Sequence, residues 1–294
     1  MAFMPALASL AIPFPKSTFY PVSCNSYNWV TFYGRNSKKW GENLAENIAE
    51  FAKTGIKAYE PSIENLAMVQ RLIPVLKKYK IAMPSVYVNS VLHEESAVNE
   101  SIKSIFEIAK EVKKYGTKII VTNPSPIKWG SPELKNDTQL AIQSLAMETL
   151  GGRLRQIGIT LAYHTHDVEL KAGAREFHHV MLNTSAQNVS FCFDVHWVYR
   201  GSENSQLAVF DVLKLYGNRI AELHIRQSVA GVWSETFTAK GDIDYNKLAK
   251  ELKKMKINPH LVIEQCVEAN SLNTIDAVNA HIKDLEAIKT TFQI

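Results

Sequence analysis

Histidine and carboxylate side chains recur at regular intervals in the second half of the sequence. His164, Asp194 and His224 follow one another at equal intervals of about 30 residues, and Glu264 lies further along in the motif VIEQ. Imidazole and carboxylate groups together suit Mn²⁺, Zn²⁺, Co²⁺ or Fe²⁺ better than Ca²⁺. Because no cysteine belongs to the set, a structural zinc site is not indicated. The pattern predicts a site for one divalent metal ion, with Mn²⁺ as the first choice.

A metal ion held there would act as a Lewis acid on a substrate with a carbonyl beside a hydroxyl. It could stabilise the enediolate that forms when a neighbouring C–H bond loses its proton. A carboxylate or an imidazole with a pKa near neutrality must move that proton. Glu264, Glu169 and His166 are the candidates, and Arg226 could fix a hydroxyl or hold the developing oxyanion. The expected substrate is a small sugar-like polyol.

Further polar and aromatic side chains lie beside short apolar segments. Such groups could bind the hydroxyls of a sugar or keto-sugar, and an indole could cover its C–H faces. An ordinary loop or packing role is the alternative for each of them. The residues expected to bind the substrate are Glu60, Asn89, Asn123, His196, Trp197 and Gln227.

The apolar segments alternate with longer amphipathic ones. Their starts are separated by roughly 25–40 residues, the length of a strand–helix unit. Segments such as KIIVT and HLVIE are apolar nearly throughout, which is typical of parallel strands buried on both faces. The predicted strands are Phe19–Cys24, Ile56–Glu60, Ile81–Val88, Lys118–Thr122, Ile159–His164, Val189–Asp194, Ile220–His224 and His260–Glu264.

Glycine stands between a predicted helix and the next strand at four places. Gly55, Gly116, Gly158 and Gly217 are expected to be left-handed stops at helix ends. Alternating strands and helices give a parallel α/β fold, and eight strands favour a closed barrel. No G-x-G-x-x-G motif follows an early strand, which weighs against a dinucleotide-binding sheet. The predicted fold is a single-domain (β/α)8 TIM barrel.

In such a barrel, reactive side chains lie at the carboxyl ends of the strands. The last four predicted strands end at or beside the four candidate metal ligands. A spacing of one strand–helix unit places successive ligands at the same height on neighbouring strands. The four groups should therefore converge at one mouth of the barrel.

Composition sets bounds on domains and partners. The 294 residues suit one large domain, with an N-terminal arm over residues 1–18 and a catalytic TIM barrel over residues 19–294. The net charge of +4 comes without a dense basic block, so no nucleic-acid partner is expected. No apolar run reaches the roughly 18 residues that a membrane span requires, so no membrane partner is expected. The sequence leaves open whether the chain forms a homo-oligomer.

The three dispersed cysteines indicate a reducing compartment, and the cytoplasm is the expected location. The opening MAFMPALASLAIPFPKS is apolar but lacks a basic region before it. A periplasmic location is therefore the less favoured alternative.

Several motifs together resemble the xylose isomerase-like barrels known as sugar phosphate isomerases/epimerases. Relatives include tagatose 3-epimerases, inosose dehydratases and 3-keto-glycoside lyases/hydratases. The resemblance spans residue 19 to the end of the chain. It rests on GIKAYE (residues 55–60), YHTHDVE (163–169), Asp194 with Trp197, ELH (222–224), GDIDY (241–245) and VIEQ (262–265).

The resemblance implies metal ligands from the last four strands, and Asp194, His224 and Glu264 match that pattern. The ligand on strand five is a glutamate in the epimerases. Here that position is His164, with His166 and Glu169 nearby, so the identity of the fourth ligand stays open among these three. The departure puts in doubt a scheme with two glutamates on opposite faces of the substrate.

Two reactions fit these expectations. The first is a metal-dependent isomerisation or epimerisation of a ketose or related polyol through an enediolate. The alternative is a metal-dependent lyase or hydratase (dehydratase) acting on a 3-keto-glycoside or an inosose. A non-catalytic sugar-binding protein is a third hypothesis. An endonuclease is not indicated, because such barrels need more metal ligands and a basic groove.

Overall fold

Eight parallel strands form a nearly closed barrel in the computed structural model, which describes residues 21–294. Their order is β2-β1-β10-β7-β6-β5-β4-β3, and bridges from Ala58 to Ala82 and from Ser62 to Tyr87 join β3 to β2. The predicted TIM barrel is confirmed, whereas the predicted arm over residues 1–18 lies outside the described residues. The barrel strands are β1 (Ser23–Asn25), β2 (Ala58–Glu60), β3 (Ser85–Tyr87), β4 (Ile119–Thr122), β5 (Thr160–His164), β6 (Val189–Asp194), β7 (Ile220–Ile225) and β10 (His260–Ile263).

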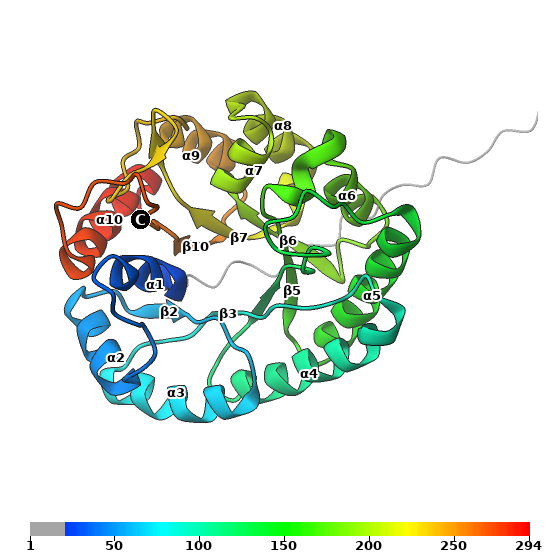
Figure 1. Ribbon diagram of the computed structural model, residues 1–294, viewed down its shortest axis with the longest axis horizontal. Helices are drawn as coiled ribbons and strands as arrows, with labels where there is room; N and C mark the ends of the chain where they lie inside the picture. The colour runs from blue at the N-terminus through cyan, green and yellow to red at the C-terminus, as the bar shows by residue number, and fades with distance from the viewer. Residues whose placement is uncertain (1–20) are drawn as a thin grey trace, which may run out of the picture.

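Helices surround the barrel as an outer ring (Figure 1). Each observed strand lies within its predicted range or ends one residue beyond it. The strands could be predicted because each apolar segment is buried on both sides. Within residues 21–294, no helix combines the length and apolarity that crossing a bilayer would require. The helices are α1 (Ser26–Gly34), α2 (Leu44–Lys53), α3 (Leu66–Tyr79), α4 (Glu95–Lys113), α5 (Asp137–Gln156), α6 (Lys171–Leu182), α7 (Val195–Gly201), α8 (Gln206–Tyr216), α9 (Tyr245–Lys254) and α10 (Ala277–Phe292), with short 3-10 turns at Val168–Leu170 and Gly217–Arg219.

The main hydrophobic core lies between the strands and the helical ring. In α2, Ile48 and Phe51 are fully buried, and in α4 Ile102, Ile105 and Ala109 are buried on one face. Burying each large apolar side chain contributes about 1.5–3 kcal/mol, which offsets the loss of chain entropy. The core therefore holds the strand ends, and the groups on them, in fixed places.

Three of the four predicted glycine stops are confirmed. Gly55, Gly116 and Gly158 have φ values of +75°, +105° and +72°, which favour glycine. The prediction for Gly217 is wrong, because its φ is −55° and it opens a 3-10 turn. Its missing side chain serves packing instead, since a Cβ there would lie 2.9 Å from Ile257.

The segment after β7 is folded and anchored. It forms a hairpin of β8 (Ser228–Val229) and β9 (Val232–Trp233). Asp242 accepts hydrogen bonds from Ser228 Oγ and from the backbone of Gly231. Asp244 caps α9 by accepting a bond from the Lys247 amide, as its position predicts. The hairpin thus gives Trp233 a fixed position.

Helix α5 approaches the start of β6 so closely that only glycine fits at one position. A Cβ on Gly151 would lie 2.6 Å from the carbonyl carbon of Asn188, whereas one on Gly152 would lie 3.7 Å from Asn188 Nδ2. We expect Gly151→Ala to destabilise the fold by about 1–3 kcal/mol. Gly152→Ala, the matched control, should be neutral or stabilise by about 0.5–1 kcal/mol through helix propensity. Thermal unfolding followed by circular dichroism distinguishes them, and equal melting temperatures would contradict the close approach.

Candidate metal centre and active site

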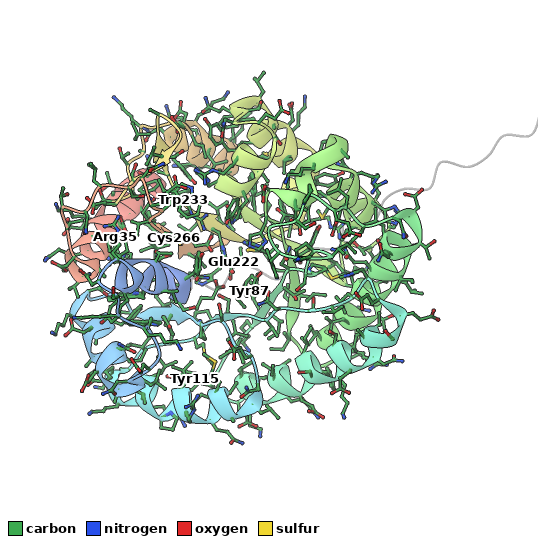
Figure 2. The ribbon with its side chains drawn as sticks, in the orientation of Figure 1. Arg35, Tyr87, Tyr115, Glu222, Trp233 and Cys266 are labelled. Atoms are coloured by element: carbon green, nitrogen blue, oxygen red, sulfur yellow. The ribbon has the colours of Figure 1, made fainter. Side chains whose placement is uncertain are left out.

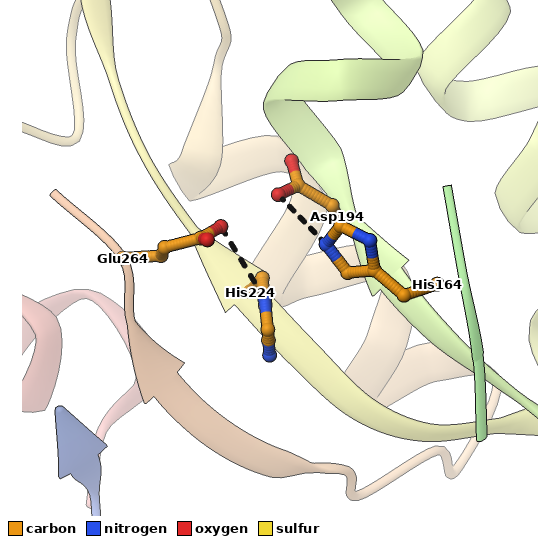
Figure 3. A group of neighbouring side chains, drawn as sticks. All are labelled: His164, Asp194, His224 and Glu264. Carbon is orange, nitrogen blue, oxygen red and sulfur yellow. Dashed lines mark ion pairs between the residues drawn. The ribbon is translucent and has the colours of Figure 1, made fainter. Parts of the chain in front are cut away.

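Four side chains from consecutive barrel strands meet at the carboxyl end of the barrel. His164 ends β5, Asp194 ends β6, His224 lies in β7 and Glu264 follows β10. One ligand atom from each lies within 4.8 Å of all the others, and all four residues are buried. Figure 3 shows the two close pairs: His164 Nε2 is 3.5 Å from Asp194 Oδ2, and His224 Nδ1 is 3.3 Å from Glu264 Oε2. The convergence predicted from the spacing is confirmed.

Strand register explains this convergence. Asp194 is paired with His224 across β6 and β7, so their side chains stand at the same height. The backbone amide of Glu264 donates to the carbonyl of Ile225, which places Glu264 beside the end of β7. Asp194 also caps α7, since its Oδ1 accepts a bond from the Trp197 amide at 2.8 Å. This bond leaves Oδ2 facing the other ligands.

The donor atoms of this group fit a metal ion. His164 Nε2, Asp194 Oδ2, His224 Nδ1 and Glu264 Oε2 are buried, and none has a hydrogen-bond partner among residues 21–294. Buried polar atoms normally have partners, and four such exceptions facing one another need a common explanation. Ligands at about 2.0–2.2 Å from a shared ion lie up to roughly 4.4 Å apart, close to the observed spread. The cluster could therefore hold one divalent ion.

Arg226 adds a positive charge beside Glu264. Its Nη2 lies 2.8 Å from Glu264 Oε2, and its Nε donates to the backbone carbonyl of the same residue. Burial acts to raise the pKa of Glu264, but the attraction of Arg226 and then of His224 outweighs it and holds that pKa well below its usual range. Nη1 of the buried Arg226 has no hydrogen-bond partner within the described chain. Glu264 is thus ionised, and a guanidinium N–H remains available.

Aromatic rings form a continuous wall beside the metal ligands. Ring centroids are separated by 5.1 Å from Trp129 to His166, by 5.4 Å from His166 to Trp197 and by 5.7 Å from Trp197 to Trp233. The guanidinium of Arg226 lies 5.1 Å from the Trp197 ring and 4.3 Å from the Trp233 ring. Trp129 is half exposed, so the wall extends from the buried ligands to solvent.

Of the three alternatives on strand five, the structure places His164 in the cluster. Glu169 is buried elsewhere: its Oε2 accepts from the His166 amide at 2.7 Å, and its Oε1 accepts from Asn123 Nδ2 at 2.9 Å. Asn123 also donates to the backbone carbonyl of His164. Burial, followed by the charge of Glu176, raises the pKa of Glu169 to about 7. Glu169 and Asn123 therefore hold the turn that follows β5.

His166 lies between the metal group and the aromatic wall. Its ring centroid is 4.8 Å from that of His164, and its Nδ1 is buried without a partner within residues 21–294. Burial and the neighbouring His164 hold the pKa of His166 well below its ordinary value. The imidazole is therefore neutral near pH 7 and able to accept a proton.

The remaining residues predicted to bind substrate lie in different settings. Glu60 is fully buried and accepts bonds from Asn25 and Ser85. Gln227 is buried and holds the loop before α9 through Ile243. His196 contacts Ser228 Oγ in the hairpin at 2.9 Å, Trp197 is partly exposed, and Asn89 is exposed after β3. The roles of these five residues in substrate binding stay predictions.

Two residues beside the cluster were not singled out from the sequence. Burial, and after it Cys266, raises the pKa of Tyr27 on α1. The charge of Arg226 lowers the same pKa and that of Glu264 raises it. Glu222 lies 3.0 Å from Nε2 of His224, near the centre of the barrel in Figure 2. Glu222 had a signal, because residues two apart on a strand share a face and it precedes His224 by two. Nothing local to Tyr27 indicated its neighbours.

Comparison with known proteins identifies the family of this chain and solved structures that share its fold. The sequence model of the xylose isomerase-like TIM barrel family matches residues 48–290. No curated protein matches the sequence. The fold is shared with 3-keto-D-glucoside 4-epimerase from E. coli, at TM-score 0.65 and 14% identity over 92% of this chain and 99% of that chain. It is also shared with D-allulose 3-epimerase from Methylomonas sp. in complex with D-allulose, at TM-score 0.65 and 15% identity over 92% and 96%.

A third solved structure contains a metal. It is a xylose isomerase-like TIM barrel protein from Mycobacterium smegmatis in complex with magnesium, with TM-score 0.67 and 11% identity over 93% of this chain and 96% of that chain. These low identities establish the shared fold.

The cluster predicts one divalent ion per chain. We expect His224→Ala to reduce the metal content measured by elemental analysis from about one ion per chain to near zero, because the variant lacks a ligand. Added metal at 100 times its Kd should stabilise the wild type by about 2.7 kcal/mol and this variant far less. His178→Gln is the control, since His178 contacts Tyr216 in the outer ring. Full metal content in His224→Ala would remove this residue from the site.

Proposed function

Because the chain belongs to the xylose isomerase-like TIM barrel family, we propose that it is a metal-dependent isomerase or epimerase acting on a ketose or related polyol. The observation that carries the proposal is the set of four buried ligand atoms that lie within 4.8 Å of one another, beside the free Nη1–H of Arg226. The structural similarity to two sugar epimerases supports it.

We assign the metal ligands as His164, Asp194, His224 and Glu264, with Mn²⁺ as the expected ion. A divalent ion bound there supplies Lewis-acid polarisation of the substrate carbonyl. Asp194 and Glu264 together balance the two charges of such an ion. The charge of Arg226 then stays available for an oxyanion.

In the proposed reaction, the ionised carboxylate of Glu264 removes the proton from the carbon beside the carbonyl. Because the pKa of Glu264 is below its usual range, this step relies on the acidification of that C–H bond that a divalent ion at the carbonyl would supply. The C–H electron pair forms the new C=C bond, and the carbonyl π electrons move to oxygen, giving an enediolate. Nη1 of Arg226 donates a hydrogen bond to that oxygen. Delivery of a proton to the opposite face of the same carbon completes epimerisation. Return of the Glu264 proton to the neighbouring carbon, with transfer of the hydroxyl proton to the former carbonyl oxygen, completes isomerisation. In epimerisation the second proton comes from solvent: His166, on the β5 side, is the candidate that accepts it and passes it to the carbon, while Glu264 releases its proton to solvent.

The aromatic wall suits a sugar. Indole rings cover the C–H faces of a sugar, while the polar groups around the metal site bind its hydroxyls. The chain contains no glycine-rich phosphate loop, so an unphosphorylated keto-sugar is the preferred substrate.

One observation favours a lyase or hydratase acting on a 3-keto-glycoside or inosose as the second candidate. The strand-five position that is a glutamate in the epimerases is His164 in this chain, so this strand supplies no second carboxylate to act as a base. Glu264 is the carboxylate of the cluster that lies at hydrogen-bond distance from Arg226. Elimination needs a base on one carbon and departure of the β-substituent, and it does not need two carboxylates on opposite faces.

Proton exchange distinguishes the two reactions. Keto-sugars and 3-keto-glycosides are incubated with the metal-loaded enzyme in D₂O and followed by NMR. We expect deuterium at the carbon beside the carbonyl together with a new epimer or isomer. Glu264→Gln should lower kcat/KM by about 10²–10⁴-fold, because it removes the base. His178→Gln should match the wild type.

Two results would count against the isomerase. Loss of water or of the aglycone without a new epimer would establish the lyase. Absence of deuterium exchange with every keto-sugar, in protein that holds its metal, would favour a sugar-binding protein.

A further inference from the structure

Two acidic side chains lie on the far side of His224 from the other metal ligands. Nε2 of His224 is 3.0 Å from Oε1 of Glu222 and 3.1 Å from Oε1 of Glu60. Both carboxyl groups are fully buried, and Figure 2 shows Glu222 near the centre of the barrel. Barrel interiors are usually filled by branched apolar side chains, and burying a carboxylate is costly. Interactions with neighbouring groups must therefore compensate the cost of burying two acidic side chains here.

The two ring nitrogens of His224 face different surroundings. Nδ1 faces Glu264 and the rest of the metal group, whereas Nε2 lies against the acidic pair. A neutral imidazole carries one proton, and the hydrogen bond at one nitrogen determines which nitrogen keeps a free lone pair. An acceptor at Nε2 holds the proton there. The lone pair of Nδ1 is then directed at the metal site.

The two carboxyl groups are unequally supported. Glu60 accepts from Asn25 Nδ2 at 2.6 Å and from Ser85 Oγ at 2.7 Å, in addition to His224. Oε2 of Glu222 has no hydrogen-bond partner among residues 21–294. Glu60 is therefore the better supported acceptor of the pair.

We propose that Glu60 and Glu222 are positioning residues for the metal ligand His224. Their oxygens accept the Nε2–H, fix the orientation of the ring and leave Nδ1 for the metal. The inference rests on the proposed metal site and extends it to a pair of residues that lie behind the ligand. Removing a partner of this kind typically weakens metal binding by about 10–100-fold.

A different arrangement would use some of the same atoms. Cys192, Glu222 and His224 also offer ligand atoms within 4.8 Å of one another. A second ion there would take Nε2 of His224 as its ligand, and Nε2 would then carry no proton. The number of ions per chain and the state of Nε2 separate this arrangement from the proposed one.

The first experiment titrates Zn²⁺ into the metal-free full-length protein and measures Kd by competition with a chelator. Glu222→Gln keeps an acceptor oxygen beside Nε2 of His224 and should bind Zn²⁺ as the wild type does. Glu222→Met has a similar size but no acceptor, and it should bind about 10–100-fold more weakly. Cys192→Ala should keep one ion per chain. Circular dichroism checks that each variant is folded.

The second experiment uses the unaltered protein, so it decides the matter even where Glu222→Met does not fold. NMR of the Zn²⁺-loaded protein labelled with ¹⁵N-histidine should show His224 protonated on Nε2 and metallated on Nδ1. The His224 signal is assigned by its loss in His224→Asn.

Each other outcome is distinct. Wild-type affinity in Glu222→Met removes Glu222 from the positioning role. A His224 without a proton on Nε2 overturns the role of both residues and leaves the metal site intact. Two ions per chain in the wild type, falling to one in Cys192→Ala, establishes the second ion in its place. A wild-type protein that binds no Zn²⁺ removes the metal site and this inference together.

Discussion

Four buried atoms that can bind a metal, and that have no hydrogen-bond partner within the described chain, determine the arrangement at the carboxyl end of the barrel. Burying such atoms without compensation costs several kcal/mol in total. The fold nevertheless keeps them together, because each is the end point of a strand whose register the apolar core fixes. A shared cation is the simplest way to satisfy all four.

The neighbouring residues follow from the same constraint. Asp194 uses one oxygen to cap α7 and keeps the other for the cluster. His224 is held at Nε2 by an acidic pair and presents Nδ1. Glu264 pairs with Arg226, whose charge keeps the carboxylate ionised in a buried position. Asp194, His224 and Glu264 therefore each have one side supported by the protein and one side facing the common centre, as a preorganised site requires.

Much of this could be predicted from the sequence, for a physical reason. Parallel strands end at the same height, and strand–helix units of similar length bring His164, Asp194 and His224 to neighbouring strand ends. The strands themselves were predictable because runs buried on both faces are apolar throughout.

Other features depend on contacts that no local pattern contains. His164, His166 and Glu169 could not be ranked from the sequence, because the choice depends on how Glu169 turns back to the His166 amide and Asn123. The contact of Glu60 with His224 joins β2 to β7, which are not adjacent in the barrel. Gly217 was misassigned because the chain enters a 3-10 turn there, with φ of −55°, rather than a left-handed turn.

A crystal grown with Mn²⁺ and measured near the manganese absorption edge tests the central claim most directly. One anomalous peak per chain is expected, about 2.0–2.3 Å from His164 Nε2, Asp194 Oδ2, His224 Nδ1 and Glu264 Oε2. A peak bound by other residues, or none at saturating Mn²⁺, would contradict the assignment of this cluster as the metal site.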